Sequence, residues 1–305
     1  MPSREEIINR LLQADTPSIR LLTLLNCCGL PIEHENVQLE QHLLATSEPV
    51  LIILKEQHPN GYWMSERSFY SPKYRATHWS MQLLMELGLK GDHPAMQSGA
   101  FFMRTAAQRG PAWLINNDGL GLSCFWGNYL RYQLHCGQFE EPAIQQVIAL
   151  LIREVERDAF CPHNYDLPCA WGLIRSLWGL AAIPPSQRSA EVEHAIQHGL
   201  EFVLDRFTLT KADYPYGQKI QRTWFSLNFP IFYNTDILFT LRVLKELDAL
   251  SHPSAQAALA WLESKRRKDG TWRGASPAHQ RTWAFTSGQD TVDTWATLHA
   301  LSLFS

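Results

Sequence analysis

Three aspartates, Asp236, Asp290 and Asp293, are the side chains of this sequence best suited to acid–base chemistry. Each stands at or near the predicted start of an apolar helix, and Arg-Thr-Trp triplets precede them at 222–224 and 281–283. When two carboxylates share a dry site, one can stay protonated and act as a general acid. The same groups could instead anchor the polar head group of a ligand. The alternative, which we favour, is that each Asp caps its helix and that the arginines of the triplets are ion-pair partners.

Tyr74, Arg75 and His78 form a second group suited to proton transfer. Tyr74 and Arg75 each lie about one helical turn from His78, so we expect the three side chains to share a face. Tyr and His could exchange protons with a substrate, as in a toroidal polysaccharide lyase. A hydrogen-bonded His in a helix core is the alternative.

The loop at residues 161–169 carries potential metal ligands in Cys161, His163, Asp166 and Cys169. Zinc takes Cys, His and carboxylate ligands, but this spacing fits no common zinc pattern. We therefore expect no metal and no other cofactor. We expect Asp166 and Cys169 to line a ligand pocket instead.

Aromatic side chains gather at or just before the predicted apolar helices. Their faces could stabilise a carbocation or bind an apolar or sugar ligand, or the rings could fill the core. The rings concerned are Trp79, Trp126, Trp171, Trp224, Phe225, Phe229, Phe232, Tyr233, Trp283 and Phe285. We expect Arg222 and Arg281 to complete this binding set.

These side chains stand at matching places in an internal repeat. Five segments open on a helix-capping residue, and four of them place Pro two positions later. The segments begin near Ser47, Asp92, Glu140, Ser189 and Ser251. The starts lie about 45 to 50 residues apart, except for a longer last interval, and this spacing is typical of helical hairpin repeats.

Each repeat combines two kinds of helix. The first is amphipathic, as in residues 142–155, and the second is apolar on most faces, as in residues 171–178. A helix that is apolar all round is packed on several sides, so we predict outer and inner helices. The inner helices are predicted to begin near Tyr74, Ser123, Pro168, Asn234 and Thr291. Gly88, Gly137 and Gly179 are expected to end three of them.

This pattern predicts an all-α protein whose hairpins close into an α/α toroid, an α6/α6-type barrel. We expect a single domain over residues 1–305, with five hairpins in 47–305 and N-terminal helices in 1–46 that close the ring. An open solenoid is the alternative. It would expose the last inner helix, residues 291–303, because no polar capping repeat follows.

Two predicted helix ends carry a short motif. Residues 57–63 read Gln-His-Pro-Asn-Gly-Tyr-Trp, and residues 268–272 read Lys-Asp-Gly-Thr-Trp, with Arg266 where the first motif has Gln57. With its repeats and these motifs, the chain resembles the terpenoid cyclase/protein prenyltransferase superfamily, and the first motif is similar to the squalene-cyclase QW repeat. The resemblance implies an α/α toroid whose ligand enters a central, aromatic-lined cavity from the N-terminal ends of the inner helices.

The resemblance also qualifies the chemistry. Class II terpenoid cyclases carry an Asp-x-Asp-Asp motif at such a helix start, and its middle Asp protonates the substrate. Aligned on Asp290 and Asp293, this chain has Val292 at the middle position, and Thr235 stands there in the preceding repeat. Because Val cannot donate a proton, we do not expect the standard cyclisation. The zinc motif of protein prenyltransferases is not matched either.

Composition excludes several classes of protein. The formal net charge is −3, and we expect the densest basic run, residues 265–268, to be a solvated helix end, so we expect no nucleic-acid partner. No apolar stretch is long enough for a transmembrane helix, and peripheral membrane contact is left open. The polar start at residues 1–4 and the six Cys are typical of a cytoplasmic protein. The oligomeric state is not indicated.

Three functions fit these features. The first is a terpenoid-cyclase-like protein that acts on or binds an isoprenoid or other apolar ligand; as an enzyme it would be a cyclase, an isomerase or a lyase. It predicts that Asp236, Asp293 and the rings converge on one apolar cavity. The second is a non-catalytic toroid that binds a lipid or a protein, with a filled cavity. The third is a carbohydrate-active toroid, a polysaccharide lyase or glycosidase, with an open polar cleft and paired carboxylates.

Overall fold

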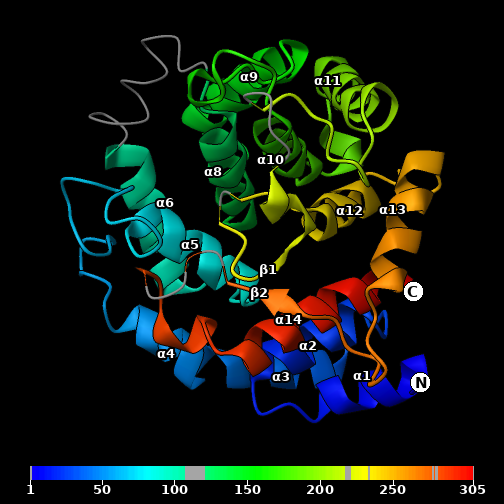
Figure 1. Cartoon of the computed structure of the whole chain (residues 1–305). Coiled ribbons are helices and arrows are strands. Elements are labelled where there is room, and N and C mark those ends of the chain that lie inside the picture. The colour runs from blue at the N-terminus through cyan, green and yellow to red at the C-terminus, as the bar shows by residue number, and fades with distance from the viewer. Residues whose placement is uncertain are drawn as a thin grey trace. The chain divides into compact units, whose positions relative to one another are not determined.

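The computed structural model describes residues 2–106, 121–216, 221–232, 234–276, 278 and 281–304. Within these residues the chain is mostly helical (Figure 1). The α-helices are α1 (Arg4–Leu12), α2 (Pro17–Asn26), α3 (Glu35–Ala45), α4 (Glu48–Leu54), α5 (Thr77–Glu86), α6 (Pro94–Ala106), α8 (Ser123–His135), α9 (Pro142–Glu156), α10 (Ala170–Ala181), α11 (Ala190–Glu201), α12 (Ile237–Glu246), α13 (Pro253–Ser264) and α14 (Gln289–Leu301). The all-α fold class is therefore confirmed.

Short elements connect these helices. The helical ones are η1 (Pro162–Asn164), η2 (Pro185–Gln187), η3 (Phe202–Arg206), η4 (Arg222–Phe225), η6 (Ala284–Thr286) and η7 (Ser302–Phe304). The strands β1 (Leu227–Asn228) and β2 (Gly274–Ala275) pair in parallel, with Leu227 opposite Gly274. In the part of the chain that the structure describes, no helix is long and apolar enough to cross a membrane.

The outer helices begin where the repeat predicted them. Ser47 is the N-cap of α4, and the Ser189 side chain accepts a hydrogen bond from the Val192 amide at the start of α11. The other three, α6, α9 and α13, begin at a Pro. Pro fits there because the first turn of a helix leaves its amides without intrahelical acceptors.

The chain groups into two compact units, which we describe separately. Unit 1 comprises Met1–Gly99, Leu227–Phe232 and Leu262–Ser305, and unit 2 comprises Ala100–Ser226 and Tyr233–Trp261. The single-domain organisation stays a prediction.

In unit 1 the last inner helix, α14, packs against α1 and α2 (Figure 1). The thiol of Cys27, which follows α2, donates to the Leu298 carbonyl of α14 over 3.9 Å. The predicted ring requires this pairing of the last inner helix with the N-terminal helices. The closed ring itself remains a prediction.

Trp63 and Trp272 make equivalent contacts at two helix ends of unit 1. The Trp63 indole N–H donates to the Ile53 carbonyl, and the Trp272 indole N–H donates to the Leu262 carbonyl, each over 2.8 Å. Both acceptors lie in the last turns of their helices, α4 and α13, where carbonyls lack intrahelical donors. The two Trp residues therefore cap the C-terminal ends of two outer helices.

Gln57 and Arg266 also make equivalent contacts, although their side chains differ: each donates to a carbonyl in its own turn and to a second carbonyl in another segment. Gln57 Nε2 donates to the carbonyl of Gly61 over 3.2 Å and to that of Ala95, in α6, over 2.9 Å. Arg266 Nε donates to the Gly270 carbonyl over 3.3 Å, and its Nη2 donates over 3.3 Å to the Pro2 carbonyl, just before α1. Arg266 thus replaces the Gln of the motif: its side chain joins the turn after α13 to the segment before α1, as Gln57 joins the turn after α4 to α6.

Unit 2 contains a close crossing of two inner helices, α8 and α10. A Cβ on Gly127 of α8 would lie 2.1 Å from the Arg175 carbonyl oxygen, and one on Gly179 of α10 would lie 2.8 Å from the Gly127 carbonyl oxygen. Gly179 is therefore an interior packing residue, and its predicted role as a helix stop is wrong. Gly88 and Gly137 do follow helix ends, with φ of 91° and 76°, in the conformation that favours Gly.

Candidate functional site

Asp236 is the N-cap residue of α12 in unit 2. Its Oδ1 accepts a hydrogen bond from the Phe239 amide over 2.8 Å, and the residue is 1% exposed. Of the sequence alternatives for Asp236, this contact corresponds to helix capping. The Arg of the preceding triplet, Arg222, is exposed.

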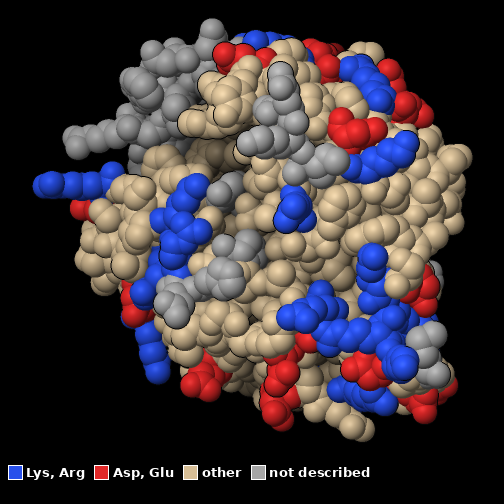
Figure 2. All heavy atoms as spheres, in the orientation of Figure 1, with Lys and Arg blue, Asp and Glu red and all other residues tan. Residues whose placement is uncertain are grey.

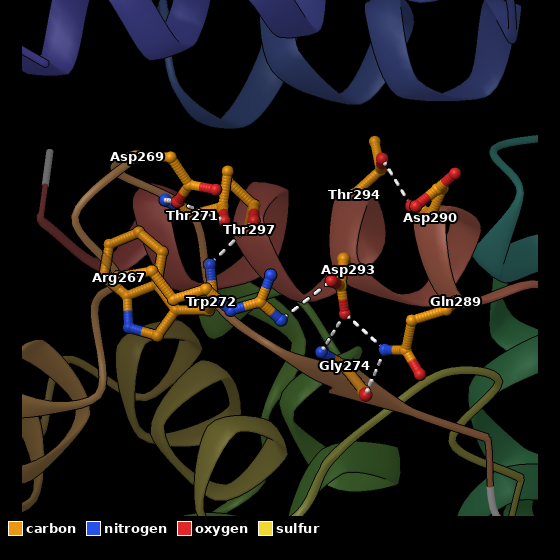
Figure 3. A network of polar contacts seen from close by, with 10 residues as sticks. All are labelled: Arg267, Asp269, Thr271, Trp272, Gly274, Gln289, Asp290, Asp293, Thr294 and Thr297. Carbon is orange, nitrogen blue, oxygen red and sulfur yellow. Dashed lines mark hydrogen bonds and ion pairs between the residues drawn. The ribbon is translucent and has the colours of Figure 1, made fainter.

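Asp293 lies in the second turn of α14, because that helix begins at Gln289 with Gly288 as its N-cap. Figure 3 shows its carboxylate directed at β2 and at the turn after α13. It accepts hydrogen bonds from the Gly274 amide over 2.7 Å, from Gln289 Nε2 over 2.6 Å and from Arg267 Nη2 over 2.8 Å. Asp293 therefore does not cap its helix, and its ion-pair partner is Arg267 rather than the predicted Arg281.

These contacts decide the charge state of Asp293. Partial burial alone would raise its pKa, but the hydrogen bonds from Gly274, Arg267 and Gln289, with the charge of Arg267, hold the pKa below its usual value. Asp293 is therefore ionised near neutral pH and accepts hydrogen bonds. Asp290 is exposed and points away from Asp293, so the two carboxylates do not form a shared dry site (Figure 3).

The basic run at 265–268 follows α13 in unit 1. Its two arginines donate hydrogen bonds to the Pro2 carbonyl and to the Asp293 carboxylate, whereas Lys265 and Lys268 are exposed. Figure 2 shows basic and acidic side chains interspersed over this segment. Such mixed charge agrees with the prediction of a solvated helix end and does not resemble a phosphate-binding stripe.

His78 is a core residue of unit 1 with 0% exposure. Its ring stacks on Tyr70 at 5.9 Å and meets Trp79 edge-on at 4.7 Å. Tyr74 and Arg75 do not share a helical face with it, because α5 begins only at Thr77 and Tyr74 has a φ of 73°. The predicted helical face shared by the three side chains is wrong.

Tyr74 and Arg75 belong instead to a cluster formed by the loops that precede α5 and α14. The Arg281 guanidinium lies 5.0 Å from the Tyr74 ring centroid, and the Arg75 guanidinium lies 4.5 Å from the Trp283 ring centroid. The Thr282 hydroxyl donates to the Tyr74 carbonyl over 3.4 Å. We call these five residues, with Tyr70 and Lys73, the loop cluster; Lys73 Nζ lies 5.8 Å from the Tyr70 ring.

The loop cluster is rich in hydrogen-bond donors. Arg281 is exposed, and Arg75 forms a half-exposed ion pair with Glu56 over 3.2 Å. Trp283 is 3% exposed, and its indole N–H has no acceptor among the residues that the structure describes. A buried donor without an acceptor is costly and suggests a ligand or water at that position.

The matching triplet in unit 2 differs at this point. Trp224 is also buried, but its indole N–H donates to the Leu209 carbonyl over 2.8 Å. Of the two Arg-Thr-Trp triplets, 281–283 therefore has a Trp indole N–H without a protein acceptor among the described residues, whereas the indole N–H of 222–224 is satisfied. The sequence alone does not distinguish them.

The cysteine loop lies in unit 2, before α10. Cys169 and Trp171 line a small pocket with Tyr214, Tyr216 and Trp224, whereas Asp166 is exposed and lies outside it. Among the described residues, no group of three or more His, Cys, Asp or Glu side chains could hold a metal ion. Three of the predicted binding residues, Cys169, Trp171 and Trp224, are thus brought together.

Two more of the predicted rings, Trp126 and Phe229, pack on neighbouring aromatic side chains. Trp126, in unit 2, contacts Phe125 and Tyr129. In unit 1, Phe229 stacks on Trp295 of α14 with 4.1 Å between centroids. Tyr233 lies outside the described residues.

Phe232 packs the segment Leu227–Phe232 against α5. Its ring lies 5.6 Å from that of Trp79 and 5.0 Å from that of Tyr74, and its carbonyl accepts from Gln82 Nε2 over 2.7 Å. Together with the Phe229–Trp295 stack, these contacts place the segment's aromatic side chains against both α5 and α14. Both rings are buried in the core of unit 1.

Sequence reasoning missed a polar pocket of about 600 Å³ in unit 2. Its polar lining includes His194, His198, His252, Glu201, Asp205 and Asp248. No motif marks these residues, although His252 stands at a predicted helix start. Comparisons with models of known families, with curated proteins and with solved structures find no match to this chain. The function must therefore be inferred from the geometry.

Proposed function

We propose that the chain is a helical-repeat toroid of the terpenoid cyclase/prenyltransferase type. The equivalent contacts of Gln57 and Arg266 support this proposal, since the first holds α4 to the next outer helix and the second holds α13 to the segment before α1. In a ring, the outer helix that follows the last hairpin is the N-terminal one. The contact of α14 with α1 and α2 supports the same closure.

The function that the site supports best is non-catalytic binding of an anionic head group, such as the diphosphate of an isoprenoid, at the loop cluster. The observation that carries it is the buried Trp283 indole N–H, which lacks an acceptor beside the guanidinium of Arg75. Arg281 and Lys73 add positive charge to the same loops. A phosphate group accepts such hydrogen bonds and would pair with these cations.

The states of the predicted acids support binding without acid catalysis. Asp293 is ionised and engaged by three donors, and Asp236 caps α12. His78 is packed among rings in the core. None of these side chains is therefore arranged as a free proton donor.

The packing of Phe229 and Phe232 favours recognition of the head group over enclosure of a hydrocarbon. Their rings lie against Trp295, in the middle of α14, and against Trp79, in the first turn of α5, and so fill space beside the inner helices at which an enclosed apolar ligand was expected. We assign the apolar part of the ligand to the isoprenoid class on the resemblance alone. The carbohydrate alternative lacks support, because no Trp, Tyr or Phe lines the polar pocket of unit 2 in the part of the chain described.

Calorimetric titration with farnesyl diphosphate, farnesol, inorganic diphosphate, squalene and an oligosaccharide tests this function. We expect both diphosphates to bind, with affinity that falls as salt is added, and the three uncharged compounds to bind at least 10-fold more weakly. Arg281→Gln should weaken diphosphate binding about 10-fold, which is the loss of about 1.4 kcal/mol. Arg222→Gln, in the matching triplet, is the control and should change nothing. Binding of farnesol as tight as that of farnesyl diphosphate would contradict the proposal.

A further inference from the structure

Two thiols meet in the loop before α10, in unit 2. A short antiparallel bridge joins Cys161 to Leu167, with the Cys161 amide donating to the Leu167 carbonyl over 3.2 Å. The Cys169 amide donates over 3.1 Å to the carbonyl of Asp158, at the other end of the loop. The chain thus turns back on itself and brings Cys161 and Cys169 onto adjacent backbone segments, close enough for the two thiols to shift each other's pKa.

The environments of the two sulfurs differ. Polar interactions with the Cys169 thiol, and then with the His163 and Asn164 amides, lower the pKa of Cys161 to about 6 against the opposing effect of burial. Cys169 is the N-cap of α10, where its sulfur accepts from the Gly172 amide over 3.4 Å. The interaction with the Cys161 thiol, and then burial, raise its pKa above the usual value. Cys161 and Cys169 are both partly exposed, and the lowered pKa makes Cys161 the more ionised thiol of the pair.

We propose that Cys161 and Cys169 form a thiol–disulfide exchange pair, in which Cys161 attacks and Cys169 resolves. The oxidant is a low-molecular-weight disulfide such as oxidised glutathione. The Cys161 thiolate attacks one sulfur of that disulfide, the S–S bond breaks, and a thiolate leaves with the electron pair. Cys169 then loses its proton to solvent and attacks the Cys161 sulfur, which expels the second thiolate. The protein dithiol is oxidised by two electrons, and the small disulfide is reduced to two thiols.

This pair is distinct from the binding function proposed above. It lies in unit 2, whereas the loop cluster lies in unit 1. It does not require a metal, and the described residues contain no group of three metal-ligating side chains. The outcome of either test leaves the other proposal standing.

Alkylation of the reduced, full-length protein provides the first test. Rates with iodoacetamide are measured at each Cys by peptide mass mapping between pH 5 and pH 9. Cys28 is the matched control, because it is exposed and burial raises its pKa. We expect the Cys161 rate to reach half its maximum near pH 6. At pH 6 a much larger fraction of Cys161 than of Cys28 is thiolate, but a less basic thiolate is also a weaker nucleophile. With both effects included, Cys161 should react at least about 20-fold faster than Cys28.

Exposure to oxidised glutathione at pH 7 provides the second test. We expect wild type to form a Cys161–Cys169 disulfide, Cys169→Ser to stop at a glutathione adduct on Cys161, and Cys161→Ser to leave Cys169 unmodified. The wild-type measurements stand if a variant fails to fold. A Cys161 rate that follows that of Cys28 at every pH would overturn the proposal, as would a wild-type adduct on Cys161 that is never resolved by Cys169.

Discussion

The Arg267 guanidinium lies 2.8 Å from the Asp293 carboxylate, and this ion pair joins the turn after α13 to the second turn of α14 (Figure 3). The same carboxylate binds the Gly274 amide at the start of β2. A Cβ on Gly274 would lie 2.0 Å from the Val292 carbonyl oxygen, so the strand can approach α14 closely only because residue 274 is Gly. Asp293, a candidate for acid–base chemistry in the sequence, thus holds β2 against the last inner helix.

Asp293→Asn should therefore destabilise the fold. The Asn amide keeps one acceptor oxygen but loses the charge that pairs with Arg267. Because the Arg267 side chain is 35% exposed, solvent screening limits the expected loss of unfolding free energy to about 1 kcal/mol. Urea unfolding of the variant and of wild type at pH 7 measures it. An unchanged unfolding free energy would contradict the structural role of Asp293.

The same carboxylate predicts a pH dependence. The pKa of Asp293 is lower in the folded protein than in the unfolded chain, where an Asp titrates near about 4. Its contribution is therefore fully present above that unfolded value and is lost as the pH falls through the folded pKa. The difference in unfolding free energy between wild type and Asp293→Asn should shrink from pH 7 to pH 3. A difference that grows on acidification would show that the sign of the shift is wrong.

The equivalence of Arg266 and Gln57 can be tested by mutation. Arg266 occupies, in the turn after α13, the position that Gln57 occupies in the turn after α4. Arg266→Gln should retain the hydrogen bond to the Gly270 carbonyl and change the unfolding free energy by less than about 0.5 kcal/mol. Arg266→Ala loses both carbonyl contacts and should cost about 1 to 2 kcal/mol. Equal losses for Gln and Ala, measured by urea unfolding, would mean that the two turns are not equivalent.

Gly127 tests the crossing of α8 and α10. Gly127→Ala brings a Cβ against a backbone oxygen, so the two helices must move apart at a cost of about 3 kcal/mol. Gly288→Ala is the control, because its new Cβ would have only the Thr291 hydroxyl within 4 Å, at 3.4 Å. We expect the control to cost less than about 1 kcal/mol. Thermal unfolding of both variants decides, and similar melting temperatures would argue against a tight crossing.

The outer helices and the inner helices were predictable because their signals are local. A cap such as Ser189 and a Pro in the first turn act within four residues of their own position. The C-terminal Gly turns at Gly88 and Gly137 are local in the same sense. Gly179 misled because a Gly near a helix end serves either as a stop or as a close-packing site, and only the neighbouring helix decides.

The site was predictable only in its residue types. The ion-pair partner of Asp293 could not be predicted from the Arg-Thr-Trp triplets, because it is Arg267, which lies in the turn after α13. Tyr74 and Arg75 were assigned to a helical face, but the helix begins at Thr77 and the loop before it turns both toward residues 281–283. Contacts between segments about 200 residues apart leave no periodic signal in the sequence.

The most direct test of the account compares Trp283→Phe with Trp224→Phe. Both changes remove an indole N–H and keep an aromatic ring, but only Trp224 donates to a protein acceptor, the Leu209 carbonyl. Calorimetric titration with farnesyl diphosphate is the measurement. We predict that Trp283→Phe weakens binding about 10-fold while Trp224→Phe leaves it unchanged and instead lowers the unfolding free energy by about 1 to 2 kcal/mol more than Trp283→Phe does. Equal affinity in the two variants would contradict the assignment of the loop cluster as the binding site.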